Sequence, residues 1–409
     1  MDPAMRGPIR IVTFSTLYPN EVQDTHGVFV ENRLRHLVAS NKVSARVVAP
    51  VPWFPFGGAA FGRYGQLAKT PSREIRFGID IVHPRYPVLP KIGMNIAPLS
   101  LYAFVKPALA RLINDGGDFD LLDAHYFFPD GVAAVMLGRA FGKPVTITAR
   151  GTDINLIPRY PVPRRMIRWA AARADGLITV CAALKDELVR LGVPPERVRT
   201  LRNGVDLEVF RPVDPQQAKD ALAIHGPVLA SVGALIERKG HDLAIRALQH
   251  LPKATLLIAG QGPEKAALAR LAAAVGVENR VRFLGGIPHQ RLREIYSAAD
   301  ALVLASSREG WPNVLLESMA CGTPVIASNV WGAPEIIKAP EAGVLLQERT
   351  AGALASAAQA LLAALPPREA TRAYAQRFSW RETTEGQIDL FSRILQTASP
   401  AMAVPRAFP

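Results

Sequence analysis

The 409-residue chain contains only two cysteines, Cys181 and Cys321. Both lie in segments where strand-like and helix-like patterns alternate, so a disulfide framework is not expected and a reducing compartment is. The chain also lacks an uncharged apolar run of about 18 residues, and its first residues show no apolar signal-peptide core. These absences predict a cytoplasmic protein whose first six residues take no part in the first strand.

Acidic residues are fewer than basic ones. The chain has 35 Asp and Glu residues against 48 Lys and Arg residues, which gives a net charge of +13. Such a charge suits nucleic acid, an anionic membrane surface or small anionic substrates. Zinc-ligand spacing, an RNP-like strand and a basic helix joined to heptads are all missing, so we expect no nucleic-acid partner. A generally basic surface without a dedicated partner is the alternative.

Residues 304–328 combine strand, loop, helix and strand with almost no filler. An apolar run at 301–306 predicts a parallel strand buried on both faces, and residues 307–312 predict a polar loop. Pro312 and Asn313 signal a helix start, with Asn313 as the capping side chain, and the helix is expected over about 314–320. Gly322 ends it before a strand at 323–328. The segment therefore predicts a βαβ unit.

Two carboxylates lie within this unit. Glu309 follows the carboxyl end of the first strand, where ligands bind in open α/β sheets, and Glu317 lies one turn into the helix. The free N–H groups at the helix start suit a phosphate, which leaves the carboxylates for hydroxyl groups of a sugar and a ribose. The alternative is that Glu309 is a solvated loop residue and Glu317 an ordinary acid of a first turn.

The sequence EGWPNVLLE at 309–317, followed by SMACGTPVIA, resembles the E-x7-E signature of the retaining GT-B glycosyltransferases of family 4, also described as group 1. The resemblance implies an α/β protein with two Rossmann-like domains facing a central cleft. Residues 1–208 would bind the acceptor, residues 209–380 would bind the nucleotide-sugar, and a helix at 381–396 would cross back to the first domain.

The resemblance also implies which residues contact the donor. Lys239 matches the lysine that binds the diphosphate, while Ala234 stands where the family usually has an arginine, so that Arg238 is the nearest substitute. The expected donor-binding residues are Gly27, Arg238, Lys239, Gly262, Ile287, Glu309, Gly310, Trp311, Asn313, Val314, Leu315 and Glu317.

A second group of expected catalytic residues lies in the first half of the chain. Arg150 occupies a position where the family often has a histidine, Asp153 follows it, and His125 closes a predicted strand at its carboxyl end. With Glu309 and Lys239 these residues complete the predicted catalytic set. The alternative for each residue of the first half is a satisfied polar group at a strand end.

The family resemblance implies transfer with retention, by front-face attack in which the leaving phosphate takes the acceptor proton. We expect a UDP- or GDP-linked donor, a saccharide or lipid-linked acceptor, and a role in cell-surface polysaccharide or glycolipid synthesis. No cofactor or metal is required, and the D-x-D sequence at Asp118 and Asp120 precedes a strand at its amino end. A nucleotide-sugar epimerase and a non-catalytic nucleotide-sugar-binding subunit are the alternatives.

Two segments suggest contact with the inner face of the cell membrane. Residues 160–173 predict a basic amphipathic helix without an acid, and residues 52–73 predict a long loop that carries Trp53, Phe54, Phe56 and Phe61. The alternatives are a solvated helix face and aromatic side chains packed on their own domain.

Overall fold

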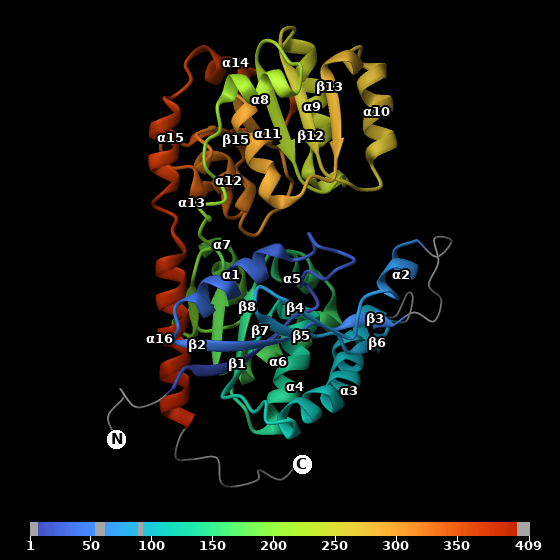
Figure 1. Ribbon diagram of the computed structural model, residues 1–409, viewed down its shortest axis with the longest axis vertical. Coiled ribbons are helices and arrows are strands. Elements are labelled where there is room, and N and C mark those ends of the chain that lie inside the picture. The colour runs from blue at the N-terminus through green and yellow to red at the C-terminus, as the bar shows by residue number, and fades with distance from the viewer. Residues whose placement is uncertain (1–6, 54–61, 89–92, 399–409) are drawn as a thin grey trace. The chain divides into compact units, whose positions relative to one another are not determined.

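The computed structural model describes residues 7–53, 62–88 and 93–398. Its contacts divide the chain into two compact units, each of which contains helices and a sheet (Figure 1). Unit 1 comprises Met1–Arg202 and Arg381–Pro409, and unit 2 comprises Asn203–Trp380.

Unit 1 contains an eight-stranded sheet of order β10-β9-β8-β7-β1-β2-β5-β4, parallel except for β4, which runs antiparallel to β5. Its strands are β1 (Ile9–Phe14), β2 (Val43–Val48), β4 (Arg73–Arg76), β5 (Ile79–Val82), β7 (Leu121–His125), β8 (Val145–Ala149), β9 (Gly176–Thr179) and β10 (Val198–Thr200). A separate parallel pair joins β3 (Val51–Trp53) to β6 (Arg85–Pro87).

Helices cover both faces of this sheet, which explains why every residue of β7 and β8 is buried. Leu34 of α1 and Phe391 and Ile394 of α16 belong to one core cluster with β1, β2 and β5. On the other side α3 packs against α4, and α4 against α6. The helices of unit 1 are α1 (Val28–Ala39), α2 (Gly62–Leu67), α3 (Gly93–Asn114), α4 (Val132–Phe141), α5 (Thr152–Asn155), α6 (Pro161–Arg173), α7 (Ala182–Arg190) and α16 (Trp380–Ala398).

Unit 2 contains a six-stranded parallel sheet of order β13-β12-β11-β14-β15-β16. Its strands are β11 (Val228–Val232), β12 (Thr255–Ala259), β13 (Val281–Gly285), β14 (Ala301–Leu304), β15 (Val325–Ser328) and β16 (Gly343–Leu346). In chain order this is the 3-2-1-4-5-6 arrangement of a dinucleotide-binding Rossmann fold. Both units are thus Rossmann-like, as the sequence predicted.

Helices cover the unit 2 sheet in two groups. Residues of α9, α10 and α14 form one core cluster against the strands, whereas α11 packs against both α8 and α12, and α12 packs against α15. The helices are α8 (Pro215–Ala221), α9 (His241–Ala247), α10 (Lys265–Ala274), α11 (Leu292–Ala298), α12 (Asn313–Ala320), α13 (Ala333–Ile336), α14 (Ala351–Ala363) and α15 (Arg368–Ala375).

The βαβ unit predicted at 301–328 is confirmed as β14, α12 and β15. One detail of the prediction was wrong, because Pro312 and not Asn313 occupies the cap position and no side chain caps the helix. Asn313 is the first helical residue, and its side-chain oxygen accepts a hydrogen bond from the Asn203 amide at 3.3 Å. Both cysteines are buried and neither forms a disulfide.

The long loop predicted at 52–73 is only partly a loop. It includes the end of β3 and the short helix α2, so local pairing and one helical turn replace part of the expected irregular chain. Trp53 is 54% exposed. The predictions for Phe54, Phe56 and Phe61 and for residues 1–6 concern residues outside the part of the chain that the structure describes.

One helix of the described residues, α3, is long and apolar enough to span a membrane by length and composition alone. Only 28% of its apolar window is buried, and Leu99 and Phe104 are exposed on it. A core helix passes the same test, and α3 does pack against α4 and β6. The helix therefore has both a packed face and an exposed apolar face.

Candidate active site

Unit 2 has its topological switch point between β11 and β14. These two strands are adjacent and parallel, but the chain leaves β11 toward β12 on one side and leaves β14 toward β15 on the other. Ligands of open α/β sheets bind at this point, outside the carboxyl ends of the strands. The loops that follow β11 and β14 carry Lys239 and Glu309 respectively.

Gly240 brings these two loops together. Its φ is +69°, a conformation that favours glycine, and a Cβ atom at this position would lie 2.1 Å from the carbonyl oxygen of Ala305. Only a residue without a side chain fits between the Lys239 loop and the end of β14. Close backbone contact at Gly240 thus places Lys239 beside the segment that carries Glu309.

Glu309 is buried and surrounded by donors. Its Oε1 accepts hydrogen bonds from Lys239 Nζ and from Ser306 Oγ, each at 2.7 Å. Burial alone would raise the pKa of Glu309, but the charges of Lys239 and Arg238 and these hydrogen bonds outweigh it, so the pKa lies below its ordinary value. Glu309 is therefore an ionised acceptor and not a solvated loop acid.

Arg238 is directed to the same carboxylate. Its Nη1 lies 3.6 Å from Glu309 Oε2 and donates to the carbonyl of Arg308 at 2.5 Å. Ala234, which stands where the family usually has an arginine, has no polar side chain. Its carbonyl oxygen lies 3.2 Å from His241 Nε2. The structure therefore brings together Arg238, Lys239 and Glu309.

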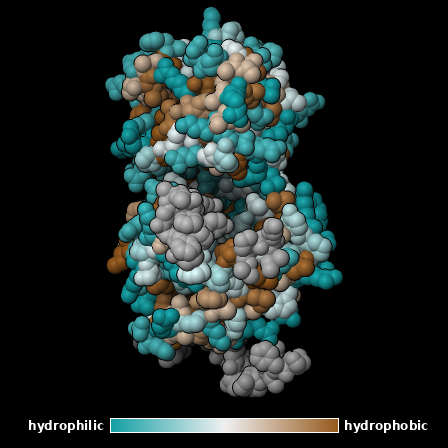
Figure 2. Space-filling view, turned by 90° about the vertical axis from the view of Figure 1, so that its right-hand side faces the viewer, coloured by the Kyte–Doolittle hydropathy of each residue, from teal (hydrophilic) through white to brown (hydrophobic). Residues whose placement is uncertain are grey.

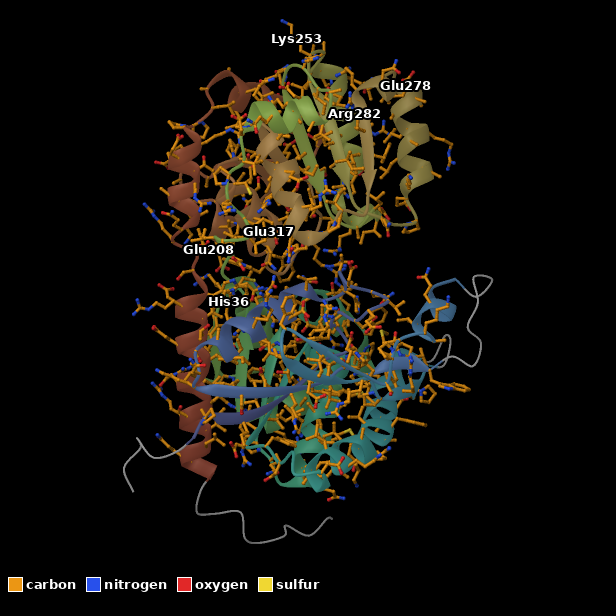
Figure 3. The ribbon with its side chains drawn as sticks, viewed as in Figure 1. His36, Glu208, Lys253, Glu278, Arg282 and Glu317 are labelled. Carbon is orange, nitrogen blue, oxygen red and sulfur yellow. The ribbon has the colours of Figure 1, made fainter. Side chains whose placement is uncertain are left out.

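Glu317 lies on α12 and is 6% exposed. Its Oε2 accepts a hydrogen bond from the Tyr296 hydroxyl at 2.9 Å, and its Oε1 lies 2.9 Å from His289 Nε2. The His289 ring packs edge-on against Phe210. Figure 3 shows Glu317 at the end of unit 2 opposite Lys253 and Glu278.

Sequence reasoning missed His289 and Tyr296, which are 28 and 21 residues from Glu317. The only available signal was the position of His289 directly after Pro288, in the stretch that follows β13. A carboxylate has about four acceptor positions, so both partners leave Glu317 able to accept from a ligand.

The other residues between Glu309 and the first turn of α12 that were predicted to bind the sugar donor have mainly structural contacts. The Trp311 indole N–H donates to the Asn203 carbonyl at 3.0 Å, and its ring packs against the Phe378 ring, with centroids 6.2 Å apart. The Leu315 amide was expected to be free, but it donates to the Pro312 carbonyl at 3.1 Å. Gly310 accepts from the Gly332 amide. Val314 lies in the first turn of α12.

Two predicted donor residues lie on other loops of unit 2. Gly262 packs so closely on the Leu235 carbonyl that a Cβ would lie 2.3 Å from its oxygen. Ile287 is partly buried in the loop after β13. Its place in a base pocket stays a prediction.

Unit 1 has a second switch point, between β1 and β7. Asp130 lies there fully buried and accepts from the Thr16 amide at 2.7 Å and from the Thr16 hydroxyl at 2.9 Å. Burial raises the pKa of Asp130 to about 7 despite these hydrogen bonds. Sequence reasoning did not select this residue.

His125 and Arg150 meet at the same edge of the sheet. His125 Nε2 lies 3.0 Å from Asp123 Oδ2, and its Nδ1 lies 2.5 Å from Arg150 Nη2. Burial lowers the pKa of His125 to about 4, so the ring is neutral near pH 7. The neutral ring donates from Nε2 to Asp123 and accepts at Nδ1 from Arg150.

Arg150 is itself buried, and burial together with the nearby Arg33 charge lowers its pKa well below the ordinary value. Its guanidinium also lies over the Phe29 ring, 5.5 Å from the centroid. The structure thus brings His125 and Arg150 together. It also places Asp123 beside His125, a residue that sequence reasoning did not select. Their catalytic role stays a prediction.

Asp153 holds the backbone of this edge. Its carboxylate accepts from the amides of Phe127 at 2.6 Å, Gly151 at 2.7 Å and Arg150 at 3.1 Å. Burial raises its pKa against these hydrogen bonds. The contacts indicate a positioning role, because the carboxylate is committed to backbone N–H groups.

Gly27 precedes α1 with φ +78°, and a Cβ there would lie 2.3 Å from the Leu17 carbonyl oxygen. The close approach explains the glycine by backbone packing. Its predicted contact with the donor phosphate stays a prediction.

The helix α16 contributes a residue to the unit 1 cluster that no local pattern revealed. Gln387 donates to Asp123 Oδ2 at 2.9 Å and accepts from Arg33 Nε at 2.9 Å. Arg33 also donates to the Leu201 carbonyl at 3.1 Å. Gln387 therefore joins a buried acid to a buried base.

The two acids of the D-x-D sequence are paired with cations. Asp118 lies 2.7 Å from Lys143 Nζ, and Asp120 lies 2.6 Å from Arg10 Nη2. Within residues 7–53, 62–88 and 93–398, no group of three or more His, Cys, Asp or Glu residues is arranged to hold a metal ion.

Family models match both halves of the chain. Residues 214–378 match "Glycosyl transferases group 1", and residues 86–209 match "Glycosyltransferase Family 4". The D-inositol 3-phosphate glycosyltransferase of Saccharomonospora viridis is 32% identical over 362 residues, covering 81% of this chain and 83% of the relative. Its counterpart from Acidothermus cellulolyticus is 32% identical over 361 residues, covering 81% of this chain and 80% of the relative.

Solved structures share the fold at lower identity. Sucrose-phosphate synthase from Thermosynechococcus elongatus superposes with a TM-score of 0.77 at 21% identity, over 95% of this chain and 100% of that chain. Anabaena HepE, solved in complex with UDP, gives 0.72 at 18% identity, over 94% and 100%. This protein therefore belongs to the group 1, family 4 glycosyltransferases and is a glycosyltransferase of the GT-B fold.

Proposed function

We propose that the protein transfers a sugar with retention from a UDP- or GDP-linked donor to a saccharide or lipid-linked acceptor in cell-surface polysaccharide or glycolipid synthesis. The observation that carries the proposal is the arrangement of Lys239, Glu309 and Glu317 around the switch point of unit 2. Anabaena HepE, of the same fold, has been solved with UDP-glucose.

Lys239 would stabilise the diphosphate as it leaves. Its ammonium group has three N–H donors and gives one to Glu309, at 2.7 Å. Its side chain remains 14% exposed, so phosphate oxygens can reach the other donors. Charge that develops on the leaving group is stabilised by such a preorganised cation.

Glu309 and Glu317 would orient the donor. Glu309 is held ionised by Lys239 and Arg238, so it accepts hydrogen bonds from hydroxyls of the transferred sugar. Glu317, beside His289 and Tyr296, would accept those of the ribose. Both carboxylates then position the donor by hydrogen bonding to its hydroxyl groups.

The chemistry needs few protein groups beyond these. In front-face attack the bond from the anomeric carbon to the leaving phosphate oxygen breaks as the acceptor oxygen bonds to that carbon. The leaving phosphate takes the acceptor proton, so no protein base is required. The diphosphate charge would be met by Lys239 and by the amides of Asn313 and Val314 at the start of α12, so that no metal ion would be needed for that purpose.

Product analysis tests this function directly. The protein is incubated with UDP-, GDP- and ADP-sugars with and without an oligosaccharide acceptor, and nucleotide release and sugar products are followed. We expect acceptor-dependent release of the nucleoside diphosphate and a product whose anomeric configuration matches the donor. A changed donor sugar without acceptor would indicate an epimerase, and binding without turnover a non-catalytic subunit.

We also propose that unit 1 contacts an anionic membrane surface from the cytoplasmic side. Leu99 and Phe104 of α3 are each 51% exposed, and Arg164, Arg165 and Arg168 of α6 are exposed on a helix that packs against α3. Figure 2 shows apolar patches on the side of the molecule that carries α2 and α3. Exposed apolar and basic groups together favour anionic lipid.

Cosedimentation with vesicles tests the membrane proposal. Leu99→Asp with Phe104→Asp should reduce binding to anionic vesicles, while Leu365→Asp, at a position in unit 2 that is 43% exposed, should not. Equal sedimentation of both variants, or of anionic and neutral vesicles, would contradict it.

A further inference from the structure

A pocket of about 330 Å³ lies within unit 1 at the carboxyl ends of β1, β2 and β5. Thr16, Asn20 and Gln23 of the loop after β1 line it, together with His83 after β5 and Tyr86 of β6. Its volume falls in the range of small-molecule sites. The carboxyl edge of a parallel sheet is also where such ligands bind.

The lining is polar, and His26 and His83 are its basic side chains among the described residues. Amide, hydroxyl and imidazole groups alternate with apolar surface from Leu17, Val51 and Leu67, and no Lys, Arg, Asp or Glu is found among the described residues that line the pocket. The lining therefore offers polar groups beside apolar contact surface.

His83 and its partner Glu74 together add no net charge beside the pocket. Its Nδ1 lies 2.9 Å from the Ala49 carbonyl and must donate to it, and its Nε2 lies 2.7 Å from Glu74 Oε1. One proton must lie between Nε2 and the carboxylate, because two lone pairs would repel at this distance. Wherever that proton lies, the charges of His83 and Glu74 sum to zero.

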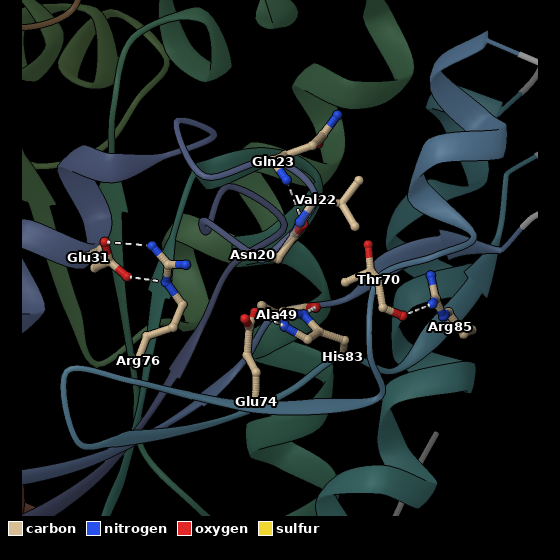
Figure 4. Close-up of polar contacts among 10 residues, drawn as sticks. All are labelled: Asn20, Val22, Gln23, Glu31, Ala49, Thr70, Glu74, Arg76, His83 and Arg85. Carbon is tan, nitrogen blue, oxygen red and sulfur yellow. Dashed lines mark hydrogen bonds and ion pairs between the residues drawn. The ribbon is translucent and has the colours of Figure 1, made fainter. Parts of the chain in front are cut away.

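The guanidinium groups of the two neighbouring arginines are directed at acceptors of the protein itself, as Figure 4 shows. Arg76 donates from Nε to Glu31 at 2.7 Å, and Arg85 donates to the carbonyls of Leu67 and Thr70. Among the described residues no Lys or Arg side chain lines the pocket, so a phosphate group there would lose water without direct contact to such a cation, which is unfavourable. A sugar ring suits the pocket, since its hydroxyls both donate and accept and its C–H faces are apolar.

We propose that this pocket binds an uncharged polyhydroxy part of the acceptor, a sugar ring or cyclitol without a phosphate group. The proposal rests on the proposed function, because it presumes an acceptor. It sets this chain apart from relatives whose name specifies inositol 3-phosphate.

The test compares matched neutral and phosphorylated probes by saturation-transfer NMR and calorimetry. The probes are myo-inositol with its 3-phosphate and glucose with its 6-phosphate, each added to the full chain with and without nucleoside diphosphate. We expect at least one neutral probe to bind about tenfold or more tightly than its phosphate. Gln23→Ala should weaken that binding.

A charge introduced into the pocket should reverse the preference. Gln23→Lys should improve binding of the phosphorylated probe about tenfold, whereas Gln376→Lys, the same change at an exposed position of unit 2, should not. Equal or tighter binding of the phosphate to the native chain, or no neutral probe sensitive to Gln23→Ala, overturns the proposal. If a nucleotide still binds, the proposed function survives that outcome; if none binds, both fall.

Discussion

The two switch points of this protein carry charged residues in different states. In unit 2 the Lys239 side chain is 14% exposed and that of His289 26% exposed, so the groups around Glu309 and Glu317 can be reached. In unit 1 Asp123 and His125 are almost completely buried. We therefore expect the unit 2 site to exchange partners with a ligand and the unit 1 site to hold a fixed shape.

The largest expected effect is from Lys239→Ala. Removing the cation should reduce kcat/KM by about 10²- to 10³-fold, because the leaving diphosphate loses a preorganised donor. Lys253→Ala, at an exposed position at the opposite end of unit 2, is the matched control. If steady-state kinetics gave kcat/KM values for the two variants within about threefold of each other, the role of Lys239 would be contradicted.

Glu309→Gln should act mainly on turnover. The amide keeps the shape but loses the charge that orients the sugar hydroxyls, so kcat should fall about 10²-fold while nucleotide affinity changes by less than about tenfold. Glu208→Gln, at an exposed site, serves as control. A larger loss of nucleotide affinity than of kcat would instead make Glu309 a nucleotide ligand.

Glu317→Gln should weaken nucleotide binding by about 10- to 100-fold, since a hydrogen bond to a charged group contributes about 1.5–3 kcal/mol. Calorimetry with the preferred diphosphate measures it. The control is Glu278→Gln, which makes the same charge change at an exposed residue at the far end of unit 2. Unchanged affinity in Glu317→Gln would remove the ribose assignment.

Changes in unit 1 should alter stability and leave nucleotide affinity intact. Gln387→Leu removes the partner of Arg33 and Asp123 and should lower the free energy of unfolding by about 1–3 kcal/mol. Denaturant unfolding compares it with Gln376→Leu, whose side chain is exposed. A loss of nucleotide affinity in Gln387→Leu would show that the two regions are not independent.

The smallest expected effect concerns pH. The folded pKa of Asp130, about 7, lies above its ordinary 3.8, so the folded protein binds this proton more tightly and its stability falls as pH rises between those values. His125, lowered from 6.5 to about 4, acts in the opposite sense, because stability falls as pH drops through that window. The two contributions partly cancel in the native chain.

Asp130→Asn should expose the contribution of His125. Melting temperatures of the variant, relative to the native chain, should increase from about pH 5 to about pH 8. A constant difference across this range would mean that Asp130 does not titrate there.

The sequence predicted the βαβ unit that carries Glu309 and Glu317. Ser306, Glu309 and α12 fall in one βαβ unit, whose strand and helix signals are local. The cap at Pro312 was missed because Asn313 turns its side chain to Asn203, 110 residues away. Gln387 and Asp123 are 264 residues apart, and no periodicity or motif links them. Contacts of that kind follow from packing and not from local pattern.

The most direct test of the central claim is a thermal-shift panel of UDP, GDP and ADP without metal, on the native chain and on Lys239→Ala. A ligand that binds only the folded state raises its melting temperature. We predict that one diphosphate stabilises the native chain selectively and that Lys239→Ala loses this shift while Lys253→Ala keeps it. No shift with any diphosphate, or an equal shift in Lys239→Ala, would contradict the assignment of unit 2 as the donor site.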